Sequence, residues 1–312
     1  MKIQKEYVIL AVALVALVAY LIFHSSDRTR YQLPVMPEVD KETISKIEIS
    51  QSGESIVINK KDKKWFIGPK EYPADSAKIK DMLDLLAKFT HTALVSESKN
   101  YKRYDLSDDK KIEVKAWSGE ELTRQFEIGK ESSTYSHTFT KLPGDFKVYL
   151  SKGNYRSRFE KDADELRDKV IMAFDKAEIK VIRVFKDKEW IELTRIEEKD
   201  KKEAAWEDKD GKKADTKKIG ELLNILSTMS CEEYIEDRKK EDLKDPIYIC
   251  NMTGKKEYTI SIFAKEDKES KKYPSISSEN DYPFILHEYD VNRMKEKLEP
   301  EKKKADSQEE IK

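Results

Sequence analysis

The sequence contains little glycine, little cysteine and little histidine: 9 glycines, 2 cysteines and 4 histidines among 312 residues. Globular proteins usually contain about 7% glycine, well above the share found here. Loops that cradle phosphate groups use glycine so that the backbone can approach the ligand closely, and neither a Walker-type nor a Rossmann-type glycine pattern occurs. The sequence therefore predicts no nucleotide cofactor.

The histidines and serines fit no known catalytic or metal-binding spacing. His24, His91, His137 and His287 do not form a motif such as His-Glu-x-x-His. A Gly-x-Ser-x-Gly nucleophile elbow is also absent. We therefore predict no catalytic residue, no cofactor-binding residue and no metal ligand.

Two charged clusters were weighed as binding or catalytic sites. Arg156 and Arg158, with Arg167 further along, either bind an anion or form a solvated helix face, and the second interpretation is favoured. Acidic residues are common in this chain, so the acidic clusters are weak evidence for a catalytic carboxylate pair; they comprise Asp108, Asp109, Asp162, Asp164 and Glu165.

The two cysteines, Cys231 and Cys250, leave two possibilities open. In an oxidising compartment they could form a disulfide. Otherwise they are two separate buried thiols that pack as small hydrophobic side chains. The sequence does not choose between these states.

The chain also has no excess of charge of one sign, because 61 basic and 62 acidic residues give a formal net charge of −1. Nucleic-acid binding needs a one-sided basic surface, so no nucleic-acid partner is predicted. An aromatic content of 10% is too high for a disordered chain of this charge. The composition indicates globular domains with a solvated, mixed-charge surface.

One long uncharged run is present, at residues 7–23. As a helix it is about 25 Å long, slightly shorter than a hydrocarbon core of about 30 Å. We predict a cytoplasmic stub and an uncleaved transmembrane signal anchor over residues 1–24. This makes the chain a single-pass protein of the bacterial inner membrane, with its C-terminal part on the periplasmic or extracytoplasmic side. A cleaved signal peptide and a buried helix are the alternatives.

A segment of the soluble part occurs twice. Residues 73–86 (PADSAKIKDMLDLL) resemble residues 213–226 (KADTKKIGELLNIL), and Trp65 and Trp206 precede the two copies at nearly the same distance. Asp75 and Asp215 suit helix N-caps, because a carboxylate accepts hydrogen bonds from the first turn. We interpret the repeated residues as a buried aromatic and a cap.

Strands and helices follow in the same order around both copies, and two further caps are predicted at Asn154 and Asp290. The predicted fold class is α+β: an N-terminal transmembrane helix followed by two duplicated units, each a small, mainly antiparallel sheet with packed helices. Tyr72 and Tyr104 lack aromatic counterparts and are candidates for a role specific to the first unit. The predicted parts after the anchor are a linker (25–43), repeat unit 1 (44–165), a junction (166–178), repeat unit 2 (179–298) and a disordered tail (299–312).

Several short motifs resemble a bacterial family of membrane-anchored proteins of unknown function with tandem units. They are Trp65 with PADS at 73–76, YDL at 104–106, FEIG at 126–129, Val148-Tyr149, and LRDK at 166–169. The resemblance implies an accessory envelope protein, often encoded beside ABC-type permeases and auxiliary proteins similar to the gliding-motility complex. It carries over no catalytic residue. Asp105 stands where relatives favour glycine, and aspartate tolerates left-handed backbone better than most residues.

The leading functional hypothesis is therefore a non-catalytic, membrane-tethered accessory or scaffold subunit, whose partner is an ABC-type permease or an auxiliary subunit. The first alternative is an envelope glycan- or lipid-binding module, which predicts a cleft lined by aromatic residues. The second is a carboxylate-dependent hydrolase, which predicts acids such as Asp105 and Asp164 converging in a pocket with raised pKa values.

Overall fold

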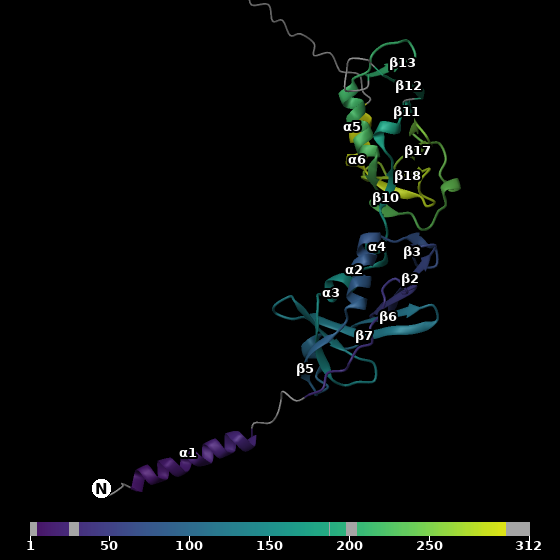
Figure 1. Ribbon diagram of the computed structural model, residues 1–312. Coiled ribbons are helices and arrows are strands. Elements are labelled where there is room, and N and C mark those ends of the chain that lie inside the picture. The colour runs from purple at the N-terminus through teal and green to yellow at the C-terminus, as the bar shows by residue number, and fades with distance from the viewer. Residues whose placement is uncertain (1–4, 25–30, 187, 198–204, 298–312) are drawn as a thin grey trace, which may run out of the picture. The chain divides into compact units, whose positions relative to one another are not determined.

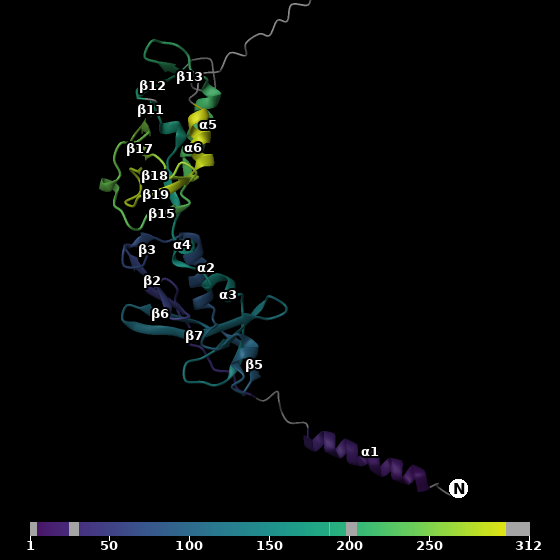
Figure 2. The same ribbon diagram turned by 180° about the vertical axis from the view of Figure 1, so that it is seen from behind.

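The computed structural model describes residues 5–24, 31–186, 188–197 and 205–297, which form two compact units, Met1–Leu166 and Arg167–Lys312. We call these unit 1 and unit 2 (Figures 1 and 2). The predicted disordered tail at 299–312 lies outside the described residues.

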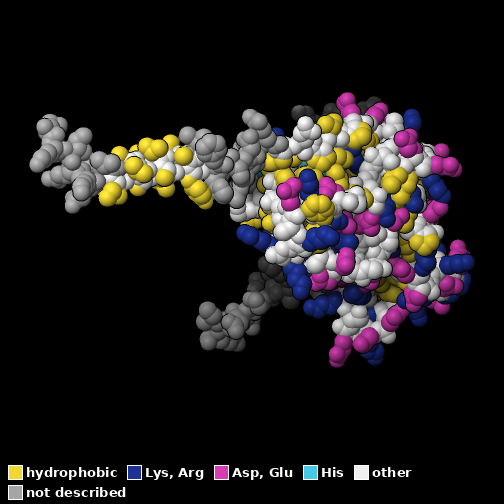
Figure 3. Space-filling model, turned by 90° about the horizontal axis from the view of Figure 1, so that it is seen from below, with side chains coloured by type: hydrophobic (Ala, Val, Ile, Leu, Met, Phe, Trp, Pro, Cys, Tyr) yellow, Lys and Arg dark blue, Asp and Glu magenta, His cyan; other side chains and the backbone are white. Residues whose placement is uncertain are grey.

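Helix α1 (Lys5–His24) forms where a helix was predicted. Its described apolar side chains are exposed along the helix and appear as a hydrophobic run in Figure 3; they are Ile9, Leu10, Val12, Leu14, Val15, Leu17, Val18 and Tyr20. Within the described ranges, none of the helices combines the length and the apolar character needed to cross a membrane. The predicted transmembrane anchor is therefore wrong, in keeping with an uncharged run shorter than the hydrocarbon core.

Unit 1 contains one antiparallel sheet of nine strands in the order β4-β3-β2-β1-β6-β7-β8-β9-β5. Its inner strands show the two-residue period of a sheet with one buried face: Ile47 and Ile49 are buried, whereas Lys46 and Glu48 are not. The strands are β1 (Lys46–Gln51), β2 (Glu54–Lys61), β3 (Lys64–Ile67), β4 (Tyr72–Pro73), β5 (His91–Ser96), β6 (Ile112–Ser118), β7 (Glu121–Glu131), β8 (His137–Lys141) and β9 (Val148–Lys152).

Helix α2 (Ser76–Ala87) supplies the other half of the unit 1 core. Ile79, Met82 and Leu86 are buried at helical spacing, and they join one cluster with Ile47 and Phe126 of the sheet. The remaining helices are η1 (Tyr101–Tyr104), α3 (Arg156–Phe159) and α4 (Ala163–Leu166). The segment before β1 also packs: Val39 is buried in the same cluster.

Unit 2 contains an antiparallel sheet of eight strands in the order β13-β12-β11-β16-β17-β18-β19-β15 and a separate two-stranded sheet, β10-β14. The strands are β10 (Val170–Ala173), β11 (Val181–Lys186), β12 (Glu189–Ile196), β13 (Ala205–Asp208), β14 (Thr228–Ser230), β15 (Glu233–Tyr234), β16 (Tyr248–Thr253), β17 (Glu257–Ile262), β18 (Lys272–Ser277) and β19 (Phe284–His287).

The helices of unit 2 are α5 (Thr216–Leu226), α6 (Glu288–Glu296) and two short turns, η2 (Lys176–Glu178) and η3 (Lys240–Asp242). Both ribbon views show α5 and α6 side by side (Figures 1 and 2). An ion pair of 2.7 Å between Glu221 of α5 and Lys297, the residue after α6, joins them. α5 buries Ile219, Leu222, Leu223 and Leu226.

The two large sheets have matching strand orders. If β1, β2, β3, β5 and β6 to β9 are matched with β11, β12, β13, β15 and β16 to β19, the neighbours are the same in both sheets. Among the strands of the described residues, β4 alone lacks a counterpart in the eight-stranded sheet. The helix that begins after the repeated aspartate also has the same place in both units. α2 comes between β3 and the edge strand β5, and α5 comes between β13 and the edge strand β15.

The predicted fold class needs correction beyond the anchor. The structure is mostly antiparallel sheet rather than small sheets with packed helices. Strands make up 39% of the structure and form three sheets, and helices make up 23%. Single-sequence periodicity finds individual strands but not their number of neighbours, so the width of each sheet was underestimated. The cap at Asp290 is also wrong: Asp290 lies inside α6, and His287 accepts the hydrogen bond from the first turn.

Candidate functional site

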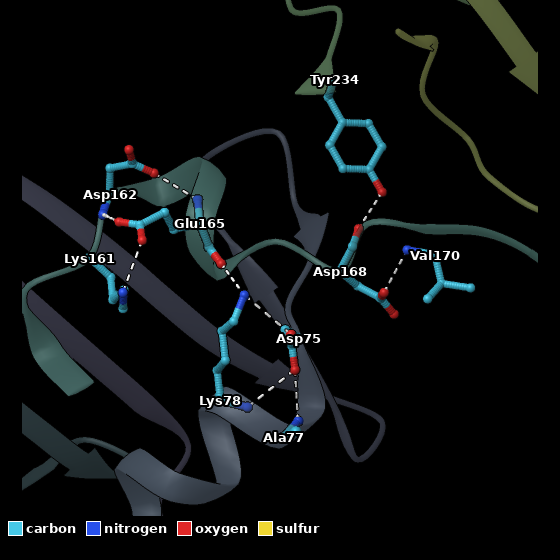
Figure 4. Close-up of polar contacts among 9 residues, drawn as sticks. All are labelled: Asp75, Ala77, Lys78, Lys161, Asp162, Glu165, Asp168, Val170 and Tyr234. Carbon is cyan, nitrogen blue, oxygen red and sulfur yellow. Dashed lines mark hydrogen bonds and ion pairs between the residues drawn. The ribbon is translucent and has the colours of Figure 1, made fainter. Parts of the chain in front are cut away.

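The repeated segment was the first candidate for a shared site, and its geometry is that of a helix start. The Asp75 carboxylate accepts hydrogen bonds from the N–H groups of Ala77 and Lys78, at 2.9 and 3.2 Å (Figure 4). In unit 2, the Asp215 carboxylate accepts from Lys217 and Lys218, at 2.9 and 3.1 Å. These bonds satisfy donors that have no partner inside the helix, which is the work of an N-cap.

The residues beside the cap extend the same structural role. Ala74 N donates to Trp65 O at 2.9 Å, and Ala214 N donates to Trp206 O at 2.8 Å. Trp206 is buried, and Trp65 packs against the unit 1 core while half-buried. The repeated tryptophan and aspartate therefore fix the connection from the third strand to the helix.

Figure 4 also shows how the last residues of unit 1 are fixed within that unit. Lys78 Nζ donates to Glu165 O at 2.5 Å. In a contact not drawn in the figure, Asp75 N donates to Leu166 O at 2.9 Å. Glu165 N in turn donates to the Asp162 carboxylate at 2.7 Å. The start of α2 thus holds the end of α4 within unit 1.

The first residues of unit 2 are fixed within unit 2. Tyr234 OH donates to Asp168 O at 2.6 Å, and Val170 N donates to the Asp168 carboxylate at 2.9 Å (Figure 4). Arg167 pairs with Glu236 at 2.6 Å. Residues 167–170 therefore belong to the folded structure of unit 2.

A buried polar cluster lies between strands β5, β8 and β9 of unit 1. The His91 Nδ1 atom is 3.0 Å from the hydroxyl of Ser151 and 3.4 Å from that of Thr140, and the two hydroxyls are 2.7 Å apart. Phe89 meets the His91 ring edge-on. Within the described part of the chain, His91 Nε2 is buried without a hydrogen-bond partner.

This cluster contains a serine and a histidine in contact, yet it does not have the properties of a nucleophilic site. Ser151 and Thr140 are fully buried, so a substrate has no path to either hydroxyl. Burial lowers the pKa of His91 to about 4, which leaves its ring neutral near pH 7. We interpret His91 as a neutral core residue.

A groove in unit 1 is the strongest candidate for a binding surface. It measures about 850 Å³ and lies between the β1–β2 hairpin and the α3–α4 segment. Its apolar lining comes from Ile49, Ile56, Phe159 and Ala163. Its charged lining is mainly acidic and comprises Glu54, Glu160, Lys161, Asp162 and Glu165.

Two acids of this groove, Glu160 and Glu165, are held in their ionised form. Arg156 donates two hydrogen bonds to the Glu160 carboxylate, at 2.5 and 2.9 Å, and lowers the pKa of Glu160. Lys161 donates to Glu165 at 2.9 Å and lowers the pKa of Glu165. Catalysis by a carboxylic acid needs a raised pKa, so the groove is better suited to binding a cationic or polar segment than to acid catalysis.

A smaller groove of about 480 Å³ lies beside α5 and α6 in unit 2. Its lining mixes the signs of charge: Glu221 and Asp290 stand with Arg293 and Lys297, beside Ile225, Met229 and polar residues. Neither groove is lined by several aromatic side chains; Phe159 is the single aromatic residue of the two linings. The aromatic cleft predicted for a glycan-binding module is therefore not found in these grooves.

Several of the charged residues singled out in the sequence are paired with opposite charges. Arg156 binds Glu160, and Arg158 lies 3.6 Å from Asp81. Asp105 pairs with Lys110 at 3.1 Å, whereas Asp164 lies in α4. The Lys111 ammonium lowers the pKa of Asp108, and a hydrogen bond from Ser107 lowers that of Asp109.

The histidines, cysteines and tyrosines also take structural positions. His137 contacts Ser136 at 2.9 Å, and His287 caps α6. Cys231 and Cys250 are both buried thiols, and burial raises the pKa of Cys250 to about 12, which makes this thiol unreactive. Tyr72 and Tyr104 are buried in unit 1. No group of three metal-binding side chains was found among the described residues.

Sequence analysis missed Arg124, which is buried on the core face of β7. Its guanidinium donates to Leu86 O at 3.1 Å and to Pro37 O at 2.6 Å, so it joins the end of α2 to the segment before β1. Burial lowers its pKa. Strand periodicity could have found it, because Arg124 precedes the buried Phe126 and Ile128 by two and four residues.

Comparison with known proteins identifies a family. The domain of unknown function DUF4340 matches residues 65–246, from β3 in unit 1 to the approach to β16 in unit 2. No curated protein and no solved structure matches the chain. Since the match covers more than half of the 312 residues, this chain belongs to the DUF4340 family.

Proposed function

We propose that this protein is a non-catalytic accessory or scaffold subunit that binds another protein through apolar and acidic surfaces. The observation that carries the proposal is α1, whose described side chains from Ile9 to Tyr20 are apolar and almost all exposed. An exposed apolar surface of this kind marks an interaction site, because leaving it in water is unfavourable. A helix that is apolar on all sides is normally covered by other protein or lipid.

The acidic groove of unit 1 supports the same function. Its lining combines apolar side chains with the ionised carboxylates of Glu160 and Glu165, which suits a partner segment carrying aliphatic and basic side chains. Paired carboxylates such as Glu160 and Glu165 contribute to selection of the partner and to its rate of association more than to affinity.

The proposed partner is an ABC-type permease or one of its auxiliary subunits, and the two sheet units are proposed to lie on the extracytoplasmic side. This identification comes from the family resemblance of the motifs at 65–76, 104–106 and 166–169. The envelope ligand-binding alternative is not pursued, since the grooves lack an aromatic lining. The hydrolase alternative is not pursued either, since the shifted carboxyl pKa values in and around the groove are lowered.

The test is purification of the full chain from its native cells in mild detergent, at native abundance and low salt, with identification of the proteins that co-elute. We expect an ABC-type permease or auxiliary subunit at a constant ratio to this chain. Replacing Leu10, Leu14 and Leu17 of α1 with glutamine should remove it. The control is Val35→Gln, a similar change at a residue 92% exposed outside α1.

Recovery of the wild-type chain alone under these conditions contradicts the proposal. Equal recovery of the partner with the α1 triple variant and with wild type contradicts the role given to α1. The location is tested separately with a cysteine introduced at the exposed Ser52. The two native thiols are buried, so a membrane-impermeant maleimide added to intact cells should label this chain only at the introduced thiol.

A further inference from the structure

The chain that enters unit 1 packs onto this unit before its first strand begins. Residues 36–43, which we call the entry strap, form neither helix nor strand. Val39 is nevertheless buried, and Met36 packs against the unit 1 core. Val35, just before the strap, is 92% exposed, whereas Ile44, just after it, is fully buried. The strap is therefore the part of the chain that leads from open solvent into the core.

A lysine of the strap is tied to the helix that follows the repeated aspartate, and unit 2 repeats this contact. Lys41 pairs with Asp84 of α2 at 2.6 Å. Lys176, in the segment before β11, donates to the side-chain oxygen of Asn224 of α5. Asp84 and Asn224 each stand nine residues after the aspartate that caps their helix. The two contacts therefore join matched positions.

A basic side chain of the second strand makes the next contact in both units. Lys60 of β2 donates from its ammonium group to Glu42 O at 3.0 Å, and Arg195 of β12 donates from its guanidinium to Ala177 O at 2.7 Å. The main-chain N–H groups of Lys60 and Arg195 donate to the carbonyl three positions further along, at 2.8 Å in both units. An entry segment fixed to its own unit is thus part of the repeat.

The third contact has the same place in both units but a different chemistry. By the strand registers, Arg124 of β7 and Tyr258 of β17 stand at matched positions. Arg124 donates to Pro37 O of the strap at 2.6 Å. Tyr258 instead packs its ring against Phe174, with centroids 5.0 Å apart. Unit 2 therefore holds its entry segment with an aromatic contact, and unit 1 holds the strap with a cation on a carbonyl.

The Arg124 contact is unfavourable for the guanidinium itself. Arg124 is 3% exposed, and both of its acceptors, Pro37 O and Leu86 O, are main-chain carbonyls without a full negative charge. Within the described residues, its Nη1 atom is buried without a hydrogen-bond partner. A buried charge and a buried unmatched donor both lose hydration that the protein does not replace. Lifting the strap returns water to this group, and the apolar packing lost is that of Met36 and Val39.

We propose that the entry strap is a releasable latch, closed by Arg124, that sets how far unit 1 can lie from α1. With the strap closed, the chain from His24 to Met36 extends to at most about 40 Å. With the strap released, the chain from His24 to Ile44 extends to at most about 70 Å. The shorter tether keeps unit 1 at a higher effective concentration near whatever binds α1. This inference does not depend on the identity of that partner.

The first test is the rate at which a maleimide labels a cysteine in the strap, in the full chain in mild detergent. Val39→Cys reports on the strap and Ile47→Cys, in β1, on the core; the two native thiols are buried. Arg124→Met keeps much of the side-chain volume but donates no hydrogen bond. It should speed the labelling of Val39→Cys about tenfold or more and leave that of Ile47→Cys unchanged. The control, Arg103→Met at an exposed arginine, should change neither rate.

The second test is the distance between α1 and unit 1, measured by pulsed electron paramagnetic resonance. Spin labels are attached to Val18→Cys in α1 and Glu54→Cys in β2, both exposed positions. Arg124→Met should extend the distance distribution to longer values, by up to about 30 Å. Arg103→Met should leave the distribution as it is.

Circular dichroism of each variant shows whether it is folded before the comparison. If Arg124→Met does not fold, Lys41→Ala breaks a partly exposed contact of the strap and should speed the labelling of Val39→Cys in the same direction. An unchanged rate at Val39→Cys in a folded variant overturns the proposal. An equal rise at Ile47→Cys also overturns it, because unit 1 then opens as a whole. Faster labelling with an unchanged distance distribution rejects the role in reach.

Discussion

His91 and Tyr149 stack ring on ring in unit 1, with centroids 4.5 Å apart and planes inclined by 30°. Tyr149 in turn donates from its hydroxyl to the Asp145 carboxylate at 2.6 Å. Burial raises the pKa of Tyr149, and burial lowers that of His91. The stack therefore joins two rings that are both neutral near pH 7, and adding a proton to His91 would place a charge inside it.

Unit 1 is accordingly expected to lose stability in mild acid. The pKa of His91 is about 4 in the folded chain and 6.5 when unperturbed, so the unfolded chain binds the proton first as the pH falls. The free energy of unfolding should drop by about 2 kcal/mol between pH 7 and pH 5 from this residue. Urea unfolding at the two pH values measures the drop. His91→Asn should remove most of it, whereas His137→Asn should not.

Removing the repeated caps should weaken each unit by a similar amount. Asp75→Ala and Asp215→Ala each leave helix N–H groups without their acceptor, and each should cost about 1 kcal/mol. Thermal unfolding of the single variants measures this. Asp81→Ala, on the exposed surface of α2, serves as control and should change the free energy of unfolding by less than about 0.5 kcal/mol. A cost at Asp215 no larger than the control contradicts the capping role.

Two glycines should respond oppositely to the same substitution. Gly220 lies inside α5, and an added Cβ meets nothing within 4 Å, so Gly220→Ala should stabilise unit 2 by about 1 kcal/mol. A Cβ on Gly129 would lie 2.2 Å from Tyr104 O, so Gly129→Ala must displace η1 or β7 and should destabilise unit 1 by more than about 2 kcal/mol. Urea unfolding of both variants compares the signs.

Asp105 should reveal the strain of a left-handed backbone. It ends η1 with φ 53° and ψ 37°, a region that glycine enters without a steric cost. Asp105→Gly and Asp105→Ala both lose the ion pair with Lys110, so that loss cancels in their comparison. Asp105→Gly should be the more stable by about 1 kcal/mol in thermal unfolding. Equal stabilities would show that η1 relaxes to another conformation.

Local features were predictable from the sequence because their causes are local. Asp75 and Asp215 were identified as caps because a carboxylate before an amphipathic segment has a direct use there. The left-handed residue at Asp105 was considered for the same reason. The cap predicted at Asp290 was wrong because His287, three residues earlier, also has an acceptor atom and stands at the end of β19.

Features that depend on distant partners were not predictable. Seven of the nine strands of unit 1 were predicted, but β4 and β5 were missed. The hydrophobic period also does not encode which strands become neighbours, such as β5 and β9. Arg124 was missed because its charge suggested exposure, while its position two residues before Phe126 placed it on the core face.

In each large sheet, the edge strand that follows the helix is synthesised well before the strand with which it pairs. α2 follows the strands at one edge, yet the next strand, β5, pairs only with β9 at the opposite edge. The ribosome therefore delivers β5 about fifty residues before its neighbour exists, and the same delay separates β15 from β19. Each unit can close its sheet only when its last strand has emerged, so a nascent chain halted before Val148 or Phe284 exposes an unpaired edge for chaperones to recognise.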